Sequence, residues 1–395
     1  MNKDALTGIR VLDFSWMLAG PYATRILADF GAEVIKVQSG KTVGGAESNL
    51  GGYFNTWNRN KLGITLDLSH TEAREIVLRL TGISDVVVEN FSPRVMSNWG
   101  LGYEKMKEVK SELIMVSMSA MGQTGPWRDF VAYGPTIQAL SGFTSLTSFN
   151  HNDPVGLGYS YSDIIAGLYA ALAVLAALEY RGRTGEGQYI DISEYEAMCT
   201  LMGPSILDMY LNDNEILPRG NESKQIPAAP YGCYKCSGTD RWCVIAVFNE
   251  VEWQSLCNLM GNPPWTGEDR FSMPSKRKEN TEALDKLLEQ WTTTFTSEKL
   301  VRILQEAGIA AGVVHNAEDL AKDPQLRARG YFMKGEHPVL GTVTSDSFPA
   351  KFSESTRIDW KTAPLLGEDN HYVYRDLLGL TEEELSLYIE KGIIS

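Results

Sequence analysis

Cysteine and histidine are scarce in this chain, with five of each among 395 residues. The odd number of cysteines, in a chain without a secretory signal, argues against a disulfide framework. Cys233 and Cys236 form one CxxC pair in YGCYKCSG, but a structural zinc ion needs four ligands. We therefore expect no metal site, and we predict that this segment is an ordinary strand.

Several nucleotide and hydrolase motifs are also missing. The turn after the first predicted strand reads SWMLAGP and contains no GxGxxG, which disfavours a nicotinamide or flavin dehydrogenase. No Walker A sequence is present, so phosphoryl transfer from ATP loses its main signal. The chain also contains no GxSxG and no HExxH, the motifs of common serine hydrolases and zinc proteases.

Positive charge is in deficit, with 36 Lys and Arg against 50 Asp and Glu and a net charge of −14. This balance argues against nucleic acid as a partner, since nucleic-acid binding requires a basic face. No uninterrupted apolar run approaches the ~20 residues of a membrane span, and the start MNKDALTGIR does not resemble a signal peptide. We expect a cytoplasmic protein with no membrane partner.

Strand and helix patterns alternate over the first 120 residues. Near-continuous apolar strands that alternate with amphipathic helices predict a Rossmann-like parallel sheet, covered by helices on both faces. Ser69 and Glu72 form a predicted capping box at the start of one of these helices. The predicted strands are 9–15, 32–38, 64–68, 85–90, 112–120 and YIDIS at 189–193, with a long helix from about Asp163 to Glu179.

The second half has a different pattern, with a predicted hairpin followed by amphipathic helices near 250–260, 279–293 and 297–307. We therefore predict an α/β fold in which a smaller α+β domain accompanies the large one. The expected division is a large domain at 1–205, a linker at 206–228 that is rich in Pro, Gly and polar residues, a small domain at 229–323, and a segment at 324–395 that returns to the large domain and ends in a helix.

Asp163 stands in GYSYSDIIAG, immediately before a long apolar stretch. Asp is favoured at helix N-termini because its carboxylate accepts hydrogen bonds from free N–H groups and suits the helix dipole. A carboxylate at this place could instead be a nucleophile. The local sequence allows both interpretations.

Five segments of the chain resemble the motifs of the family III CoA-transferases, the formyl-CoA and carnitine CoA-transferase group, and they occur in the same order as in that family. They are AGPYATRILADFGAEVIKVQ, NRNKLGITLDL, DVVVENFSPRVMSNWGLGYE, SMSAMGQTGP and YSDIIAGLYAALAVLAALEYRGRTGEGQYIDIS. PYGCYKCSG, RARGYF and APLLGE continue the family order in the second half. The resemblance covers nearly the whole chain and implies an interlocked dimer, either a homodimer or a heterodimer with a related chain.

By this resemblance, Asp163 occupies the catalytic aspartate position of the family. Its carboxylate would attack an acyl-CoA thioester, giving an aspartyl anhydride and then an aspartyl-CoA thioester. The resemblance implies acyl-CoA and a carboxylic acid as substrates, with no tightly bound cofactor. The expected activity is transfer of CoA from a donor such as succinyl-CoA to a bulky organic acid similar to benzylsuccinate.

Other positions are carried over from the same resemblance. The expected CoA-binding positions are Met17, Leu18, Leu66, Asn90, Phe91 and Tyr133, although Leu66 could equally be a core leucine and Asn90 a turn residue. Asn98 stands where a phosphate-binding Arg is common, so Arg59, Lys61 and Arg94 are candidates for the missing positive charge, with surface charge as the alternative. The acceptor pocket is expected to include Trp16, Tyr159 and Tyr161.

Two other functions stay open. The family contains acyl-CoA racemases and epimerases, which use a His for proton transfer; this chain has Tyr133 at the matching place. The chain could also be a CoA-binding subunit that supports a catalytic partner. The presence of Asp163 argues against a supporting subunit, whereas the altered phosphate-site residues favour one.

Overall fold

The computed structural model describes residues 4–149, 153–213, 218, 220–221, 226–354 and 360–395. The chain forms two compact units. Unit 1 comprises Met1–Ser145, Gly156–Ile216 and Arg327–Ser395, and unit 2 comprises Leu146–Val155 and Leu217–Leu326. Residues 214–217, 219 and 222–225 of the expected linker lie outside the described residues, and the domain limits at 205, 228 and 323 stay predictions.

Unit 1 contains a parallel sheet of six strands in the order β3-β2-β1-β4-β5-β6. This confirms the predicted α/β fold with a Rossmann-like sheet. Strands β1, β4 and β5 are buried along nearly their whole length, as expected for strands covered on both faces. The strands are β1 (Arg10–Asp13), β2 (Glu33–Gln38), β3 (Lys61–Thr65), β4 (Val86–Glu89), β5 (Ile114–Ser119) and β6 (Tyr189–Ser193).

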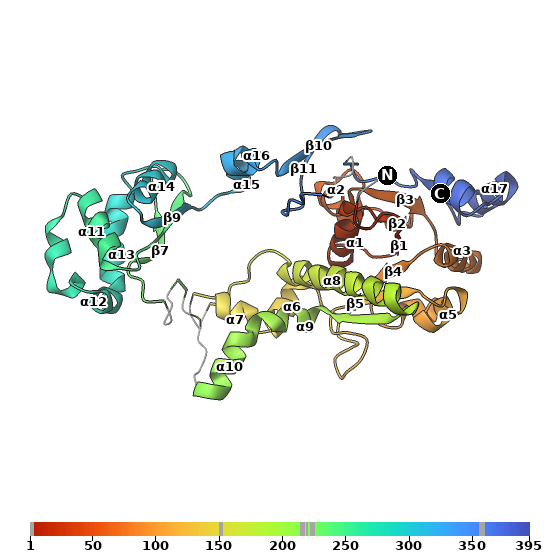
Figure 1. Ribbon diagram of the computed structural model, residues 1–395, viewed down its shortest axis with the longest axis horizontal. Coiled ribbons are helices and arrows are strands. Elements are labelled where there is room, and N and C mark those ends of the chain that lie inside the picture. Colours follow the sequence, from red (N-terminus) through yellow and green to blue (C-terminus); the bar gives the residue numbers. More distant parts are fainter. Residues whose placement is uncertain (1–3, 150–152, 214–217, 219, 222–225, 355–359) are drawn as a thin grey trace. The chain divides into compact units, whose positions relative to one another are not determined.

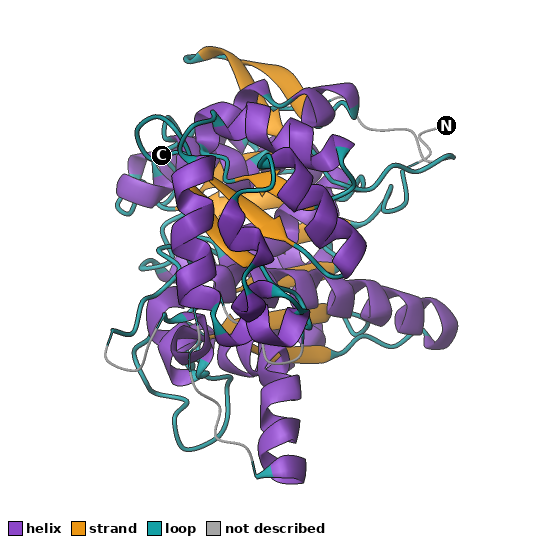
Figure 2. Cartoon of the chain, turned by 90° about the vertical axis from the view of Figure 1, so that its left-hand side faces the viewer, coloured by secondary structure: helices purple, strands orange, loops and turns teal. Residues whose placement is uncertain are grey.

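Helices cover both faces of this sheet, and an apolar cluster fills each side (Figures 1 and 2). One cluster includes residues of α1 and α8, and the other includes residues of α3, α5 and the C-terminal helices. The helices of unit 1 are α1 (Ala19–Asp29), α2 (Gly52–Asn58), α3 (Thr71–Gly82), α4 (Val95–Asn98), α5 (Tyr103–Val109), α6 (Gly134–Leu140), α8 (Tyr161–Thr184), α9 (Glu194–Cys199), α10 (Gly203–Asn212), the π-helix Tyr372–Leu377 and α17 (Glu382–Glu390).

Helix α8 lies against α1, and a glycine permits their close approach. A Cβ atom at Gly167 would come within 2.8 Å of the Ala19 carbonyl oxygen and 2.9 Å of the Tyr22 ring. Ala166, Ala170 and Ala177 continue the buried face of α8. Small side chains along one face thus place the start of α8 beside the start of α1.

The C-terminal segment completes unit 1. The hairpin of β10 (Phe332–His337) and β11 (Gly341–Asp346) is followed by a segment that bonds to β3. The Tyr374 hydroxyl donates to the Thr65 carbonyl at 2.7 Å, and the Thr65 hydroxyl donates to the Ser395 carbonyl at 2.6 Å. The chain end therefore fixes the last residue of β3.

Unit 2 is a three-stranded antiparallel sheet with helices packed on it. Its strands are β7 (Tyr231–Lys235), β8 (Trp242–Ala246) and β9 (Ala310–Val313), and the β7–β8 pair is the predicted hairpin that contains Cys233. Its helices are α11 (Glu250–Leu259), α12 (Pro274–Glu279), α13 (Thr281–Thr292), α14 (Ser297–Glu306) and α15 (Ala317–Lys322); α7 (Phe143–Thr147) and α16 (Pro324–Ala328) each span a point where the chain passes between units.

Three local predictions were wrong. Strand β3 occupies Lys61–Thr65, three residues before the predicted strand at 64–68, because its pairing with β2 starts at Lys61. Helix α3 has His70 as its N-cap with no side-chain capping bond, so Ser69 and Glu72 form no capping box; Glu72 pairs with Lys391 instead. Helix α8 continues to Thr184, five residues beyond its predicted end.

Helix α8 is long and apolar enough to cross a bilayer by length and composition. Such a helix is weak evidence for a membrane span, since core helices of water-soluble proteins pass the same test. One face of α8 is packed in the apolar core of unit 1.

Candidate functional site

The strand order of unit 1 reverses between β1 and β4, which lie side by side and lead to opposite halves of the sheet. In open α/β sheets of this kind, ligands bind beyond the carboxyl ends of the strands at such a reversal. Trp16, Met17 and Leu18 lie in the loop that follows β1, and Asn90 and Phe91 follow β4. The fold therefore brings five sequence-predicted residues to one edge of the sheet.

Asp163 lies in the first turn of α8, three residues after the N-cap Ser160. The Ser162 hydroxyl is 3.3 Å from Asp163 Oδ2 and also 3.3 Å from the Gly134 carbonyl oxygen. A Cβ atom at Gly134 would lie only 2.6 Å from Asp163 Oδ2, so a glycine is needed for the first residue of α6 to approach the carboxylate this closely. Asp163 is therefore not the N-cap, and its carboxylate packs against the start of another helix.

Burial raises the pKa of Asp163 to about 6, although the Ser162 hydroxyl partly opposes this shift. Within the described part of the chain, no Lys, Arg or His forms an ion pair with it. The carboxylate is consequently ionised at neutral pH but poorly solvated. A poorly solvated anion without a counter-ion is suited to attack an electrophilic carbonyl carbon.

A second buried carboxyl group stands beside Asp163. Glu194 is the first residue of α9, which packs against both α6 and α8. Burial raises the pKa of Glu194 to about 8, and the negative charge of Asp163 contributes to this rise. Burial and their mutual repulsion therefore favour a state in which the two carboxyl groups together carry one negative charge rather than two.

Several tyrosines belong to the segments near Asp163. Tyr159 is 48% exposed, and burial raises its pKa, as do the nearby Tyr22 and Asp163. Burial raises the pKa of Tyr53 to about 12, with further contributions from the charges of Asp163, Tyr159 and Glu47. Tyr161 stacks on Phe143 with a centroid distance of 5.8 Å. Tyr53, Tyr159 and Asp163 thus form one cluster at the start of α8.

Trp16 and Asn90 are joined by two hydrogen bonds between the Asn90 amide and the Trp16 peptide groups. The Trp16 side chain is 43% exposed, whereas Leu18 is fully buried. The Met17 N–H donates to a carboxylate oxygen of Glu47 at 2.7 Å. Glu47 thus bonds to the loop after β1, and burial together with the charges of Asp163, Tyr159 and Glu47 raises the pKa of Tyr53.

The remaining predicted CoA-binding residues differ in exposure. Leu66 is 2% exposed and belongs to the apolar core, which favours the core role that the sequence left open. Phe91 is half-buried and contacts Trp99 edge to face at 5.4 Å. Tyr133 is exposed and is the N-cap of α6, immediately before Gly134.

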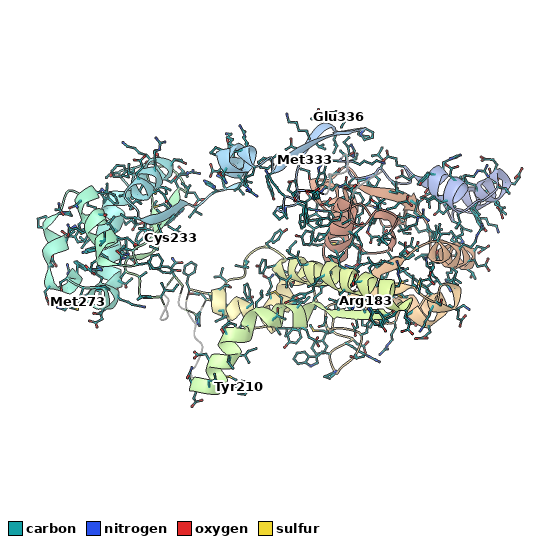
Figure 3. All side chains as sticks on the ribbon, viewed as in Figure 1. Arg183, Tyr210, Cys233, Met273, Met333 and Glu336 are labelled. Carbon is teal, nitrogen blue, oxygen red and sulfur yellow. The ribbon has the colours of Figure 1, made fainter. Side chains whose placement is uncertain are left out.

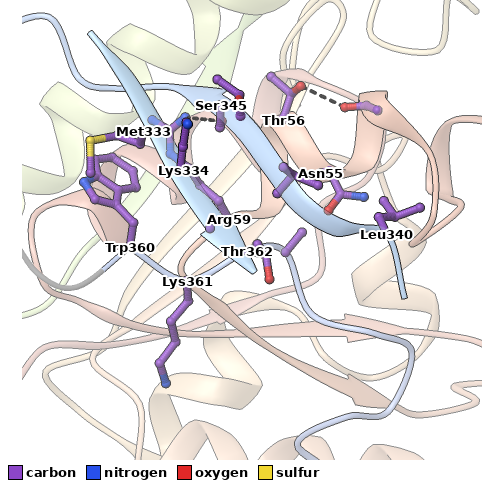
Figure 4. Close-up of a pocket in the computed structure, with 15 residues that line it drawn as sticks. Asn55, Thr56, Arg59, Met333, Lys334, Leu340, Ser345, Trp360, Lys361 and Thr362 are labelled. Carbon is purple, nitrogen blue, oxygen red and sulfur yellow. Dashed lines mark hydrogen bonds between the residues drawn. The ribbon is translucent and has the colours of Figure 1, made fainter. Parts of the chain in front are cut away.

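Arg59 is not available to a phosphate group, contrary to the expectation from the sequence. Its guanidinium is buried, lies 2.6 Å from Asp29 and 2.9 Å from Asp346, and stacks over Trp360 at 4.5 Å. It lines a cavity of about 310 Å³ between α2, the β10–β11 hairpin and residues 360–363, where Figure 4 shows it beneath the hairpin. Two carboxylates already neutralise its charge, so it serves the packing of the C-terminal segment.

Lys61 is also buried and bonded to other groups of the protein. Its ammonium group is fully buried and donates to Asp13 Oδ2 at 3.0 Å, the Thr24 hydroxyl at 2.8 Å and Asn58 Oδ1 at 2.9 Å. Burial lowers the pKa of Lys61 to about 8, and the charge of Asp13 opposes that shift. Lys61 is therefore bonded within the protein, which disfavours its predicted assignment to the CoA phosphates.

Arg94 differs from the other two cations. It is exposed, pairs with the exposed Asp129 at 2.9 Å, and adopts the left-handed φ of 74° just before α4. An exposed pair of this kind is weak and is easily exchanged for a phosphate. Arg94 thus stays a candidate for CoA binding.

No cluster of three or more His, Cys, Asp or Glu side chains able to hold a metal ion occurs within the described ranges. Cys233 lies in β7, and Cys236 is buried just beyond it. Burial raises the pKa of both thiols, which disfavours the thiolate form that binds metals.

Sequence reasoning missed Glu47, Tyr53 and Glu194. Each lies in a segment whose local pattern suggested only a loop or a helix start. Glu194 follows β6 directly, a common place for an N-terminal acidic residue, so no local signal separates it from an ordinary helix-dipole residue. Only the packing of α6, α8 and α9 brings it to Asp163.

Known proteins are similar to this chain in sequence and in fold. Residues 6–370 match CoA-transferase family III. A succinyl-CoA:D-citramalate CoA-transferase from Chloroflexus aurantiacus is 35% identical, with 98% of each chain covered. A formyl-CoA:oxalate CoA-transferase from Rhodopseudomonas palustris is 31% identical, with 99% of this chain and 97% of the relative covered.

Solved structures agree with these matches. A CAIB/BAIF family protein from Brucella suis has a TM-score of 0.88 at 30% identity, covering 95% of this chain and all of the other. The protein Rv3272 from Mycobacterium tuberculosis has a TM-score of 0.78 at 29% identity, covering 94% of this chain and 99% of the other.

Proposed function

The chain belongs to CoA-transferase family III and is a CoA-transferase, and we propose that Asp163 is the nucleophile of its reaction. One Asp163 oxygen attacks the thioester carbonyl carbon of the acyl-CoA. The C–S bond breaks, CoA leaves as a thiolate, and a mixed anhydride remains on Asp163. The thiolate then attacks the aspartyl carbonyl and releases the donor acid as a carboxylate. The resulting aspartyl-CoA thioester transfers CoA to the acceptor through the same two steps in reverse.

The observation that carries this proposal is the surroundings of the Asp163 carboxylate. It lies in the first turn of α8, is mostly buried, and has no cationic partner in the parts of the chain that the structure describes. A buried carboxylate with a purely structural role is usually paired with a cation, whereas Asp163 instead has the Ser162 hydroxyl at 3.3 Å. Gly134 lets the start of α6 pack directly against Oδ2, since a Cβ atom there would lie only 2.6 Å from this oxygen.

We further propose that the donor is succinyl-CoA and that the acceptor is an acid with a bulky apolar group, such as a benzylsuccinate-like acid. Trp16 and Tyr159 are both about half exposed, and Tyr53 lies in the same cluster. Aromatic rings of this kind favour an apolar group over formate or oxalate. The D-citramalate transferase supports succinyl-CoA as the donor.

The test is covalent trapping. With donor acyl-CoA alone, hydroxylamine should convert Asp163 to a hydroxamate that mass spectrometry detects in the peptide containing YSDIIAG. Asp163→Asn should lose both the adduct and turnover. Asp85→Asn is the matched control, because Asp85 lies at the amino end of β4 and accepts a bond from the Arg10 N–H. Full turnover by Asp163→Asn, with deamidation excluded, would contradict the covalent mechanism.

The acceptor is tested separately with succinyl-CoA and a panel of carboxylic acids, following new thioesters by mass spectrometry. Aromatic or branched acids should outperform formate and oxalate. Exchange of the α-hydrogen in D₂O without new thioesters would indicate a racemase. Binding of CoA without any reaction would indicate a supporting subunit.

We also propose that a second chain, either another copy or a related chain, covers an apolar surface formed by α8 and α10. Its exposed members are Leu168, Leu172, Leu175, Leu207, Tyr210 and Leu211. Figure 3 shows Tyr210 near the end of α10, beyond the body of unit 1. Large exposed apolar side chains gathered on a helix are typical of an interface between subunits.

A further inference from the structure

The loop between β1 and α1 is held by a side chain from the other half of the sheet. The Trp16 N–H donates to Asn90 Oδ1 at 2.8 Å, and Asn90 Nδ2 donates to the Trp16 carbonyl oxygen at 2.9 Å. The two residues are 74 positions apart in sequence. The side-chain amide of Asn90 thus bonds to both the backbone N–H and the backbone carbonyl of Trp16, at the point where the strand order reverses.

The next residue in this loop has an unfavourable backbone conformation. Met17 has a φ of 63°, in the left-handed region that residues with a Cβ atom seldom adopt. Its N–H donates to Glu47 Oε1 at 2.7 Å, and the Glu47 side chain is 8% exposed. A non-glycine residue keeps such a conformation only when its surroundings fix it. Asn90 Nδ2 thus donates to the carbonyl oxygen of the Trp16–Met17 peptide group, and the N–H of the same peptide group donates to Glu47.

This loop leads directly into the part of α1 that lies against α8. The Ala19 carbonyl lies beside Gly167, one turn after Asp163. A shift of residues 16–17 would therefore move the Trp16 side chain and the start of α1 relative to the nucleophile.

We propose that Asn90 and Glu47 are positioning residues of the transfer reaction, which hold the Trp16–Met17 backbone in its left-handed turn so that this loop forms a fixed wall beside Asp163. This inference rests on the proposed role of Asp163. It gives Asn90 a function that does not require contact with CoA. It also assigns a function to Glu47, which lies in a segment that the sequence marks only as a loop.

The first test compares two changes at one position. Glu47→Gln keeps an oxygen that accepts from the Met17 N–H, whereas Glu47→Ala removes it. We expect Glu47→Gln to keep a rate of Asp163 adduct formation close to wild type, and Glu47→Ala and Asn90→Ala each to lose about 10- to 100-fold in single-turnover experiments at saturating acyl-CoA. Thr381→Ala is the stability control, because it removes a helix cap within α17.

Adduct formation separates this proposal from the proposed function. If wild type forms no adduct, the role of Asp163 is wrong. If wild type forms the adduct and Glu47→Ala and Asn90→Ala form it as fast as Thr381→Ala does, the positioning proposal is wrong. Equal losses in Glu47→Gln and Glu47→Ala would also overturn it, because the charge and not the hydrogen bond would then be required.

A double variant tests the link to the backbone of Met17. Glycine adopts a φ of about 63° without steric cost. The loss caused by Glu47→Ala should therefore be several-fold smaller in a Met17→Gly background than in wild type. An equal loss in both backgrounds would show that Glu47 does not act through the conformation of residue 17, and would overturn the proposal for Glu47.

Discussion

Lys61 Nζ lies 3.0 Å from Asp13 Oδ2, and both side chains are completely buried at the junction of β1, β3 and α1. The charges of Lys61 and Lys36, together with bonds from Ser15 and Thr24, hold the pKa of Asp13 below its ordinary value even though burial opposes this. The pair therefore remains ionised inside the protein and supports the first residues after β1.

Lys61→Met should destabilise the protein by about 3–5 kcal/mol, because it leaves the buried Asp13 carboxylate without its partner. Urea denaturation monitored by circular dichroism measures the free energy of unfolding. Lys105→Met is the control, since Lys105 is exposed and pairs with the exposed Glu108. A change at Lys61 as small as the change at Lys105 would contradict a buried structural pair.

Arg94→Ala should weaken CoA binding and reduce its salt dependence, because Arg94 is the exposed member of the three cations first considered for the phosphates. Isothermal titration with CoA at low and high salt measures both quantities. Lys105→Ala is the matched control, since both side chains are 53% exposed and each pairs with one exposed carboxylate. Identical affinities for the two variants at low salt would remove Arg94 from the CoA site.

The rate of adduct formation should depend on pH with two limbs. The rate should rise through about pH 6, as Asp163 loses its proton. It should fall through about pH 8, as Glu194 loses its proton and gives the site a second negative charge. Glu194→Gln should keep the limb near pH 6 and lose the limb near pH 8. Stopped reactions with succinyl-CoA across pH 5–9 measure this, and an unchanged alkaline limb in the variant would show that another group causes it.

Glu194 also predicts how stability changes with pH. Its pKa in the folded protein, about 8, exceeds its ordinary value of 4.5. Between these values the folded state keeps a proton that the unfolded state has released, so this group lowers the free energy of unfolding as pH rises. Glu194→Gln should therefore gain stability relative to wild type between pH 5 and pH 8. The exposed Glu112, as Glu112→Gln, should show no comparable trend in the same denaturation series.

A charged substitution on α10 should disrupt the proposed subunit interface. Tyr210→Glu combined with Leu211→Glu places two charges on side chains that are 77% and 71% exposed in the single chain, so the fold of unit 1 should survive. Light scattering should show a smaller assembly than wild type. Leu387→Glu on α17 is the control for an isolated exposed leucine. An unchanged mass for the double variant would place the interface elsewhere.

The order of the elements could be predicted from the sequence because it depends on local patterns. Apolar runs such as DVVVEN and ELIMVSMSA, separated by amphipathic helices, indicate buried parallel strands, and parallel strands need helical connections. Asp163 could also be found from its segment, since the residues around it resemble one family over a long stretch. Both inferences use neighbours in sequence.

The partners of charged and polar groups could not be found in this way, because they are distant in sequence. Arg59 meets Asp346 from 287 residues away, and Asn90 binds the peptide groups of Trp16 across 74 residues. An arginine or lysine in a strand segment looks the same whether its charge meets a ligand or a buried carboxylate. The sequence by itself determined the α/β framework and the place of Asp163. Only the tertiary structure decided that Arg59 and Lys61 are interior cations and that Glu194 lies beside Asp163, because these outcomes depend on which carboxylates the packing of distant helices brings within a few ångströms.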